Sequence, residues 1–255
     1  MLTKPLTPPI WINNATALKK MAEHLLTCFQ LAVDTESNGL HAYREQVCLI
    51  QFSDGQNDYL VDTLAIKDLS ALSPVFDSAQ LEKIFHACEY DIICLKRDFG
   101  FSFKNIFDSM IASRILGFKA VGLGSVLEEI FALKIDKRFQ QANWGQRPLS
   151  QEMIEYARLD VHYLIDLRTQ LQNRLEEAER WQLAWEDFER LVQVEAKKET
   201  FSSRDMVWRV AGQQELDPYQ AAILSKLIEY RENYAKKRNI PNHKVLSNKL
   251  LVEIA

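Results

Sequence analysis

The order of the short apolar segments between residues 29 and 107 constrains the fold of this 255-residue chain most strongly. These segments are rich in branched and aromatic side chains, which is typical of buried strands. Turn residues such as Asp54-Gly55 separate the first three, so we expect an antiparallel meander there. The later segments alternate with helical patterns, which predicts a mixed sheet with helices on its faces. The predicted strands are 29–35, 47–52, 59–61, 83–86 and 105–107.

Apolar positions at helical spacing predict helices between these strands and after them. A long helical region begins after Ser150, which we expect to cap it, and runs to Leu175 or beyond. The apolar pattern lapses over 195–205, where we place a linker, and the rest is predicted to be helical. We therefore expect an α/β domain over residues 1–195 and a small all-α domain over 196–255. The other predicted helices are 15–26, 68–76, 90–97, 108–116, 125–131 and 219–237.

The composition narrows the classes of function. The chain is 47% hydrophobic with a net charge of −4, which argues against coating nucleic acid by bulk charge alone. Residues 201–255 are nevertheless basic, with 9 Lys and Arg against 6 Asp and Glu. No apolar run approaches the ~18 residues of a membrane span. The four cysteines form no CxxC pair, so we expect reduced core residues in a cytoplasmic protein.

Acidic residues in three separate segments are the strongest chemical signal. Asp34 and Glu36 lie two apart at the end of a predicted strand, so they point the same way. Asp91 lies between a strand and a helix, and Tyr156 and Asp160 share a helix face at a spacing of four. Four acids brought together would repel one another unless divalent cations bind them, and carboxylates suit Mg²⁺ or Mn²⁺. Such a site is suited to phosphodiester hydrolysis with two metal ions.

Two nearby residues receive different interpretations. Tyr156 is a poor base at its ordinary pKa of ~10, so we expect it to hydrogen-bond and aim the attacking water. Asp108 precedes a helical pattern, and we expect it to cap that helix rather than to bind metal.

The acidic segments also resemble a known family. LAVDTE (31–36), HACEYD (86–91) and YARLD (156–160) match, in order and spacing, the three motifs of the DEDD 3′–5′ exonuclease superfamily, tyrosine subclass. The stretches FKNIFDSMIASRILG (103–117) and NWGQRPLSQEMIEYARLDVHYL (143–164) are similar to bacterial ribonuclease D. The likeness covers roughly residues 10 to 175.

This resemblance implies an RNase H-like α/β fold and a two-metal exonuclease. By position, Asp34, Glu36 and Asp160 would hold the cation that activates water. Asp34 would bridge to a second cation, which Asp91 would bind directly or through water. The products would be nucleoside 5′-monophosphates released one at a time from the 3′ end.

The C-terminal residues resemble the HRDC module, a small helical unit that often contacts nucleic acid. The segments WRVAG (208–212), 224–241 and 244–255 carry this likeness, and the module is expected to be incomplete because the chain stops at Ala255. The resemblance and the basic charge make four cations candidate phosphate contacts. They are Arg231, Lys236, Lys237 and Arg238; for the last three, a solvated helix end is the alternative.

Two further residues are candidate substrate contacts. His86 is expected to touch the terminal phosphate or sugar, or else to be a histidine at the edge of the core. Leu40 matches a position where relatives wedge an apolar side chain against the 3′ base, or else it is a core or loop leucine. We thus expect a monomeric 3′–5′ exoribonuclease acting on RNA 3′ ends, tRNA precursors in particular. The alternatives are a DNA 3′–5′ exonuclease and a non-catalytic RNA-binding adaptor.

Overall fold

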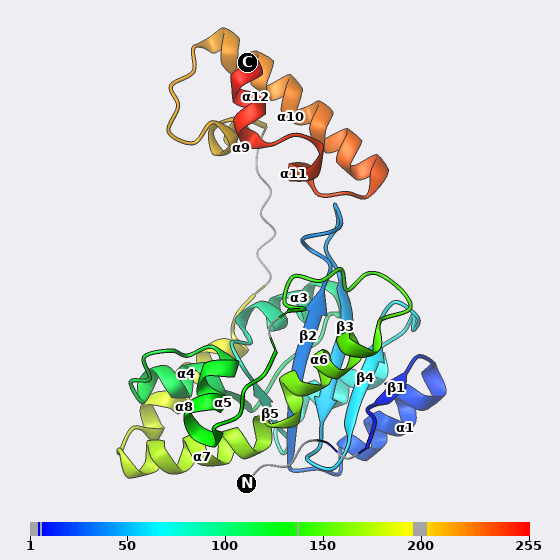
Figure 1. Cartoon of the computed structure of the whole chain (residues 1–255), viewed down its shortest axis with the longest axis vertical. Helices are drawn as coiled ribbons and strands as arrows, with labels where there is room; N and C mark the ends of the chain where they lie inside the picture. Colours follow the sequence, from blue (N-terminus) through cyan, green and yellow to red (C-terminus); the bar gives the residue numbers. More distant parts are fainter. Residues whose placement is uncertain (1–4, 6, 137, 196–202) are drawn as a thin grey trace. The chain divides into compact units, whose positions relative to one another are not determined.

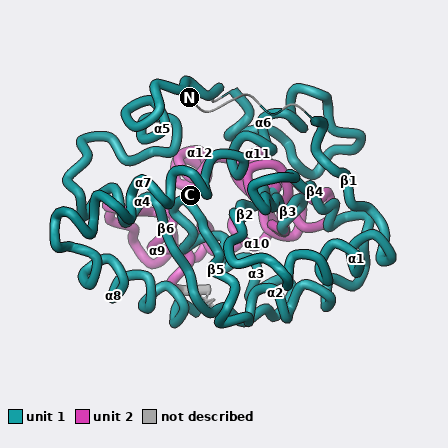
Figure 2. Tube along the Cα trace, turned by 90° about the horizontal axis from the view of Figure 1, so that it is seen from below, with its two compact units in different colours: residues 1–37, 47–196 teal, residues 38–46, 197–255 magenta. Residues whose placement is uncertain are grey.

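The chain divides into two compact units in a computed structural model that describes residues 5, 7–136, 138–195 and 203–255. Unit 1 comprises residues 1–37 and 47–196, and unit 2 comprises residues 38–46 and 197–255 (Figure 2). The boundary expected between residues 195 and 196 adjoins residues 196–202, which lie outside the description. Most of the linker expected over 195–205 lies there too.

Unit 1 is built on a mixed sheet, as the strand pattern predicts (Figure 1). Antiparallel pairing joins β2 to β3 and β3 to β4, and the remaining neighbours are parallel. Within the described residues, the strand order is β1-β4-β3-β2-β5-β6. The strands are β1 (Ile10–Ile12), β2 (Gln30–Ser37), β3 (Val47–Ser53), β4 (Asp58–Asp62), β5 (Glu82–Phe85) and β6 (Ile106–Asp108).

The helices of unit 1 follow the predicted order with two differences. The segment expected over 68–76 divides into a 3-10 turn, Ser70–Leu72, and the short α2. The region after Ser150 divides into three helices, the first two meeting at Tyr163. The helices are α1 (Ala15–Leu25), α2 (Ser73–Asp77), α3 (Glu89–Phe99), α4 (Ser109–Ile115), α5 (Leu123–Phe131), α6 (Gln151–His162), α7 (Leu164–Glu177) and α8 (Trp181–Val192).

Two predicted caps are confirmed. Asp108 Oδ1 accepts the backbone N–H groups of Met110 and Ile111 at 2.8 and 3.0 Å, so α4 begins one residue after Asp108. Ser150 Oγ accepts the N–H of Met153 at the start of α6. Each side chain supplies an acceptor for N–H groups that have no partner within the helix.

Alternating side chains of β2 join two different parts of the core. Leu31 and Val33 lie in an apolar cluster with residues of α1, α2 and α3. Ala32 points the other way, into a cluster with residues of α4, α5, α7 and α8. This alternation places every second residue of β2 toward the face on which the later helices pack.

Unit 2 is helical, as predicted. Its helices are α9 (Ser203–Ala211), α10 (Pro218–Arg238), α11 (Asn242–Val245) and α12 (Asn248–Ile254). Asp217 and Gln220 form a capping box at the start of α10. The small core includes Val207 of α9, Leu224 and Ile228 of α10, and Leu251 of α12.

None of the helices in the described part of the chain combines the length and the apolarity that a bilayer crossing requires.

The core beneath the meander makes a testable stability prediction. The Phe76 ring is fully buried, and its centroid lies 5.9, 4.9 and 5.0 Å from those of Phe52, Phe101 and Phe103. Phe76→Ala should therefore lower the free energy of unfolding by about 3–5 kcal/mol, measured by urea denaturation. Phe29 is 85% exposed, so Phe29→Ala is the matched control and should change it by less than ~0.5 kcal/mol. Equal losses in the two variants would contradict the packing described.

Candidate active site

Two acids lie near the carboxyl end of β2 on the same face of the sheet. Asp34 and Glu36 share the face of Ala32, as their spacing predicts, and this face is the one that α6 and α7 cover. A bulge in the pairing of β2 with β3 follows between Glu36 and Ser37. The strand thus presents both carboxylates toward the helix that carries Tyr156 and Asp160.

Asp91 comes from the first turn of α3 and is tied to the same strand. Its Oδ1 accepts a hydrogen bond from the Thr35 hydroxyl. The start of α3 is held by Asp108, whose Oδ2 accepts the Cys88 N–H at 2.7 Å. Asp108 therefore both caps α4 and fixes the backbone just ahead of Asp91.

Tyr156 and Asp160 lie one turn apart on α6. The Tyr156 hydroxyl donates to the Asp160 carboxylate. The tyrosine ring is packed against two aromatic rings, with centroids 5.9 Å from Phe139 and 6.0 Å from Trp144. These contacts leave the phenol little freedom except at its hydroxyl end.

A cavity of about 340 Å³ joins the strand, α6 and the start of α5. Asp91 is 9% exposed and does not line it, but reaches the group through Thr35. Sequence reasoning missed Thr35, Met110 and Gln140. Thr35 lies within the LAVDTE segment but is not one of its acids, and Met110 and Gln140 are single residues outside the motifs that carry no periodic signal. The lining residues are Asp34, Thr35, Glu36, His86, Ala87, Met110, Gly122, Leu123, Gln140, Tyr156 and Asp160.

Burial raises the pKa values of all four acids, and like charge adds to this for Asp34, Glu36 and Asp91. For Asp34 the causes are burial and then the charges of Asp91, Asp160 and Glu36, and its pKa lies well above the ordinary range. The pKa of Glu36 is also raised well above the ordinary range, by burial and then by the charges of Asp160 and Asp91. Burial raises the pKa of Asp91 and of Asp160 to about 7. At neutral pH the group therefore resists full ionisation.

The donor set fits a small, hard dication. It consists of carboxylate oxygens with a phenol nearby, which suits Mg²⁺ or Mn²⁺ better than softer metals. Positive charge would also relieve the repulsion that raises the pKa values. No three of these acids, within the described part of the chain, have ligand oxygens all within 4.8 Å of one another. Binding would therefore draw the side chains closer together.

His86 lies at the edge of this cavity. Its Nδ1 is 2.8 Å from Ser109 Oγ, and the Ser109 hydroxyl donates to the Phe85 carbonyl at 2.9 Å. The serine oxygen is then the acceptor, which assigns the proton to Nδ1 and leaves Nε2 as an acceptor. Nε2 is buried and makes no well-formed hydrogen bond. Burial lowers the pKa of His86, although the charge of Asp108 and a contact with the Val121 backbone oppose that shift. A neutral imidazole with a vacant acceptor thus lines the cavity.

The remaining candidate substrate residues belong to unit 2. Leu40 is 53% exposed, so it is not a core residue. Lys236, Lys237 and Arg238 are exposed on the last turn of α10. The expectation for Arg231 is wrong: it is 3% exposed, and its Nη1 donates to Leu246 O and Asn248 Oδ1 at 3.1 and 2.7 Å. Its guanidinium stabilises unit 2 and is not presented to a phosphate.

The fold and the acidic site define a class of nuclease. A family model described as 3′–5′ exonuclease matches residues 9–176, which is most of the chain. The chain therefore belongs to the 3′–5′ exonuclease family, as its motifs predict. The family match ends at residue 176, before the helices of unit 2, so the HRDC likeness stays a prediction.

Curated relatives come from eukaryotes and bacteria. The exosome complex exonuclease RRP6 of Saccharomyces cerevisiae is 32% identical over 96% of this chain and 36% of its own length. Exosome complex component 10 of Homo sapiens is 29% identical over 98% of this chain and 29% of its length. Ribonuclease D of Pseudomonas paraeruginosa is 29% identical over 96% of this chain and 65% of its own length. The chain thus spans about a third of the length of the exosome relatives. The expected closer likeness to bacterial ribonuclease D is not borne out, because the similar proteins are mainly of the RRP6 type.

Solved structures agree on the fold. The catalytic core of RRP6 from Trypanosoma brucei superposes with a TM-score of 0.91 at 24% identity, covering 99% of this chain and 71% of that one. Escherichia coli RNase D gives 0.75 at 25% identity, with 97% and 66% covered. Brucella melitensis NrnC with bound Mg²⁺ gives 0.62 at 25%, with 84% and 98% covered. The expected RNase H-like fold is confirmed, and a relative of this fold binds Mg²⁺.

Burial of the Asp160 carboxyl predicts how stability depends on pH without metal. Because the pKa of folded Asp160 is about 7 against an ordinary 3.8, the folded chain binds protons more tightly, and stability falls as pH rises through that window. Asp160→Asn in EDTA should therefore raise Tm, by more at pH 8 than at pH 5, measured by calorimetry. Glu177→Gln is the control, because this exposed side chain lies at the end of α7, and it should leave Tm unchanged. If Asp160→Asn raised Tm by the same amount at pH 5 and at pH 8, the raised pKa of Asp160 would not be the cause of the stabilisation.

Proposed function

We propose that the chain is a metal-dependent 3′–5′ exoribonuclease that releases nucleoside 5′-monophosphates. The observation that carries the proposal is the set of buried acids around one cavity, whose charges raise one another's pKa values. Membership of the exonuclease family supports the reaction. The names of the relatives, an exosome exonuclease and a ribonuclease, support RNA as the substrate.

The four acids are proposed to hold two divalent cations, Mg²⁺ or Mn²⁺. Asp34, Glu36 and Asp160 would hold one, and Asp34 with Asp91 the other. Bound cations of this kind activate a water and stabilise the leaving oxygen of a phosphodiester. The Thr35 and Asp108 hydrogen bonds described above would keep Asp91 in place beside the strand.

Tyr156 is proposed to orient the attacking water and not to remove its proton. Burial, then the charges of Asp160, Glu36 and Asp34, raises its pKa far above the ordinary value, so the phenol stays protonated. A protonated phenol can donate one hydrogen bond and accept others. Packing between Phe139 and Trp144 would fix the direction of that contact.

His86 is proposed to bind a hydroxyl of the terminal sugar. Its Nε2 is an acceptor without a partner at the cavity edge, and a ribose hydroxyl is a donor of the right kind. A phosphate oxygen offers no proton at neutral pH, so it would leave this acceptor unsatisfied. Of the two contacts expected for His86, its neutral state therefore favours the sugar over the phosphate.

Loss of single groups should separate these roles. Asp34→Asn should lower kcat by at least ~10³-fold, which corresponds to about 4 kcal/mol of barrier, because both cations would lose a ligand. Tyr156→Phe should lower kcat by roughly 10²-fold with KM little changed. The assay is hydrolysis of a labelled single-stranded RNA in Mg²⁺, with Glu177→Gln as the control. Full activity in Asp34→Asn would overturn the site.

A side-by-side digestion distinguishes the candidate functions. Matched single-stranded RNA and DNA of one sequence are incubated with the protein and Mg²⁺, and the shortened products are counted. Faster loss of RNA is expected. Faster loss of DNA would support a DNA 3′–5′ exonuclease, and binding without cleavage of either would support an RNA-binding adaptor.

Unit 2 is proposed to add RNA affinity as an HRDC-like module. Along α10, the exposed Tyr230 and Tyr234 rings are stacked with centroids 6.3 Å apart, and the Arg238 guanidinium lies 5.7 Å from the Tyr234 centroid. Lys236 and Lys237 are exposed on the same final turn. Aromatic faces beside cations suit single-stranded nucleic acid, because bases stack and phosphates pair with the charges.

Stacking and charge in unit 2 should be separable by salt. Tyr230→Ala with Tyr234→Ala should weaken RNA binding by ~1–3 kcal/mol per base lost from the stack, with little change in the salt slope. Alanine at Lys236, Lys237 and Arg238 should weaken binding and flatten the slope of log K against log salt. Lys249→Ala on α12 is the charge control. Unchanged affinity in both sets would contradict a role for this face.

Other expectations stay proposals. They are a preference for tRNA precursors, a cytoplasmic location, a monomeric state, and contact of Leu40 with the 3′ base. None of them is needed for the chemistry proposed above.

A further inference from the structure

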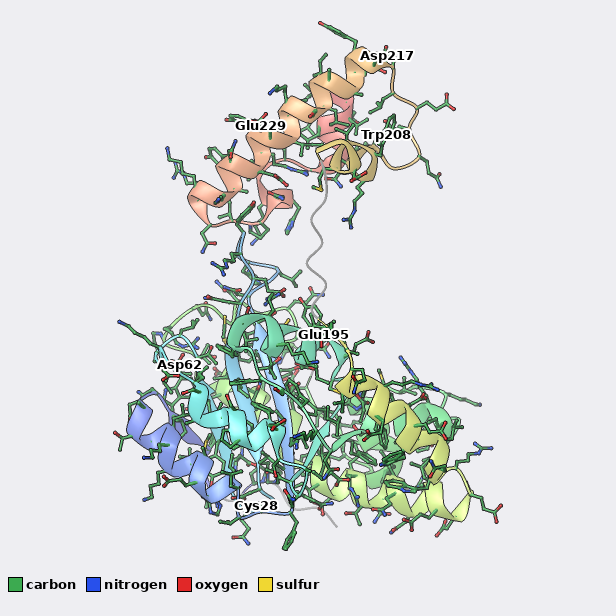
Figure 3. All side chains as sticks on the ribbon, turned by 180° about the vertical axis from the view of Figure 1, so that it is seen from behind. Cys28, Asp62, Glu195, Trp208, Asp217 and Glu229 are labelled. Carbon is green, nitrogen blue, oxygen red and sulfur yellow. The ribbon has the colours of Figure 1, made fainter. Side chains whose placement is uncertain are left out.

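A second group of ligand-type side chains lies away from the acidic cavity. His24, Cys28 and Asp54 each offer one ligand atom, and the three atoms lie within 4.8 Å of one another. Within the described part of the chain, this is the group of at least three His, Cys, Asp or Glu side chains whose ligand atoms lie this close together. Cys28 lies just after the end of α1, at the edge of unit 1 (Figure 3).

Local backbone geometry holds this group together. After α1 ends, the Thr27 and Cys28 N–H groups donate to His24 O and Leu25 O at 2.9 and 3.1 Å, which keeps Cys28 one turn beyond His24. Asp54 occupies the turn between β3 and β4, where its Oδ1 accepts the backbone N–H groups of Gln56 and Asn57 at 2.8 and 2.7 Å. The positions of all three residues are thus fixed by main-chain hydrogen bonds.

The second oxygen of Asp54 completes a prearranged site. His24 Nε2 lies 2.8 Å from Asp54 Oδ2, and the Tyr59 hydroxyl donates to the same oxygen at 3.2 Å. Burial opposes ionisation of Asp54, but hydrogen bonds from Asn57 and His24 outweigh it and lower the pKa. Asp54 is therefore a carboxylate, already oriented by a tyrosine in the way that outer partners orient metal ligands.

We propose that His24 Nε2, Cys28 Sγ and an Asp54 carboxylate oxygen bind a transition-metal ion of the zinc class. Three ligands of the nitrogen, sulfur and oxygen types are the set that zinc takes, with a fourth position left to solvent. On binding, the Cys28 thiol releases its proton to solvent. The proton that His24 Nε2 donates to Asp54 also leaves Nε2, and the neutral ring takes a proton from solvent on Nδ1, so that Nε2 is free to bind the cation. The cation then takes the place of the hydrogen bond between His24 and Asp54.

This site differs from the acidic cavity in place and in metal preference. The first residue of β2, Gln30, is four residues from Asp34, which is roughly 13 Å at ~3.3 Å per residue, and Cys28 lies two residues before it. The sites therefore share no ligand. A thiolate and an imidazole favour zinc-class ions over Mg²⁺, whereas the four carboxylates favour the harder ion. Binding at His24, Cys28 and Asp54 would join the end of α1 to the β3–β4 turn.

Cobalt titration tests the proposal on the full chain. Co²⁺ is added to reduced protein, and the near-ultraviolet thiolate-to-cobalt absorption is recorded. One equivalent of Cys28-dependent absorption is expected, lost in Cys28→Ser and weakened at least tenfold in affinity in His24→Ala. Carboxylates give no such absorption, so cobalt in the acidic cavity does not interfere. His243→Ala, an exposed histidine of α11, is the matched control and should titrate like the unaltered chain.

A second measurement guards against a folding defect. One equivalent of Zn²⁺, added to protein already saturated with Mg²⁺, should raise Tm more in the unaltered chain than in Cys28→Ser, because ligand binding to the folded state stabilises it. Circular dichroism of each variant checks its fold. Absence of thiolate absorption at saturating Co²⁺, or its persistence in Cys28→Ser, would overturn the proposal. Loss of exonuclease activity in Asp34→Asn would leave this result unaffected, so the two proposals fail independently.

Discussion

Electrostatic repulsion among four buried carboxylates is the constraint on which the site in unit 1 depends. Each acid has a raised pKa, and the charges that raise those of Asp34 and Glu36 belong to other members of the group. Such an arrangement destabilises a fold unless protons or cations neutralise it. The scaffold therefore has to hold the acids in place by other means. Hydrogen bonds from Thr35 to Asp91 and from Cys88 to Asp108, together with the aromatic contacts of Tyr156, provide them.

Local spacing in the sequence predicted most of this scaffold. The i, i+2 pair on β2 and the i, i+4 pair on α6 point where the periodicities of strand and helix require, and the Asp108 cap follows from one residue before a helical pattern. The strand β1 was missed because its three residues directly follow the proline-rich segment that ends at Pro9, which gives no strand pattern. Thr35 and Gln140 were missed because their roles arise only from tertiary packing.

Arg231 shows how composition can mislead where periodicity is informative. It was grouped with the basic residues that follow it, yet it lies at helical spacing from the apolar residues Leu224, Ile228 and Ala235, all of which are buried. Because Arg231 lies on this apolar stripe, its side chain is buried, and its guanidinium donates to Leu246 O and Asn248 Oδ1. Position on the helix, and not charge, therefore decides which cations of α10 can meet a phosphate.

If the acidic site binds cations as proposed, it couples folding to catalysis. Any ion that neutralises Asp34, Glu36, Asp91 and Asp160 removes an unfavourable term from the folded state, so binding free energy is at the same time folding free energy. Substitutions that relieve the repulsion should stabilise the metal-free chain but would remove the proposed ligands. The stability of the metal-free protein and the activity of the metal-bound protein therefore change in opposite directions along this set of residues.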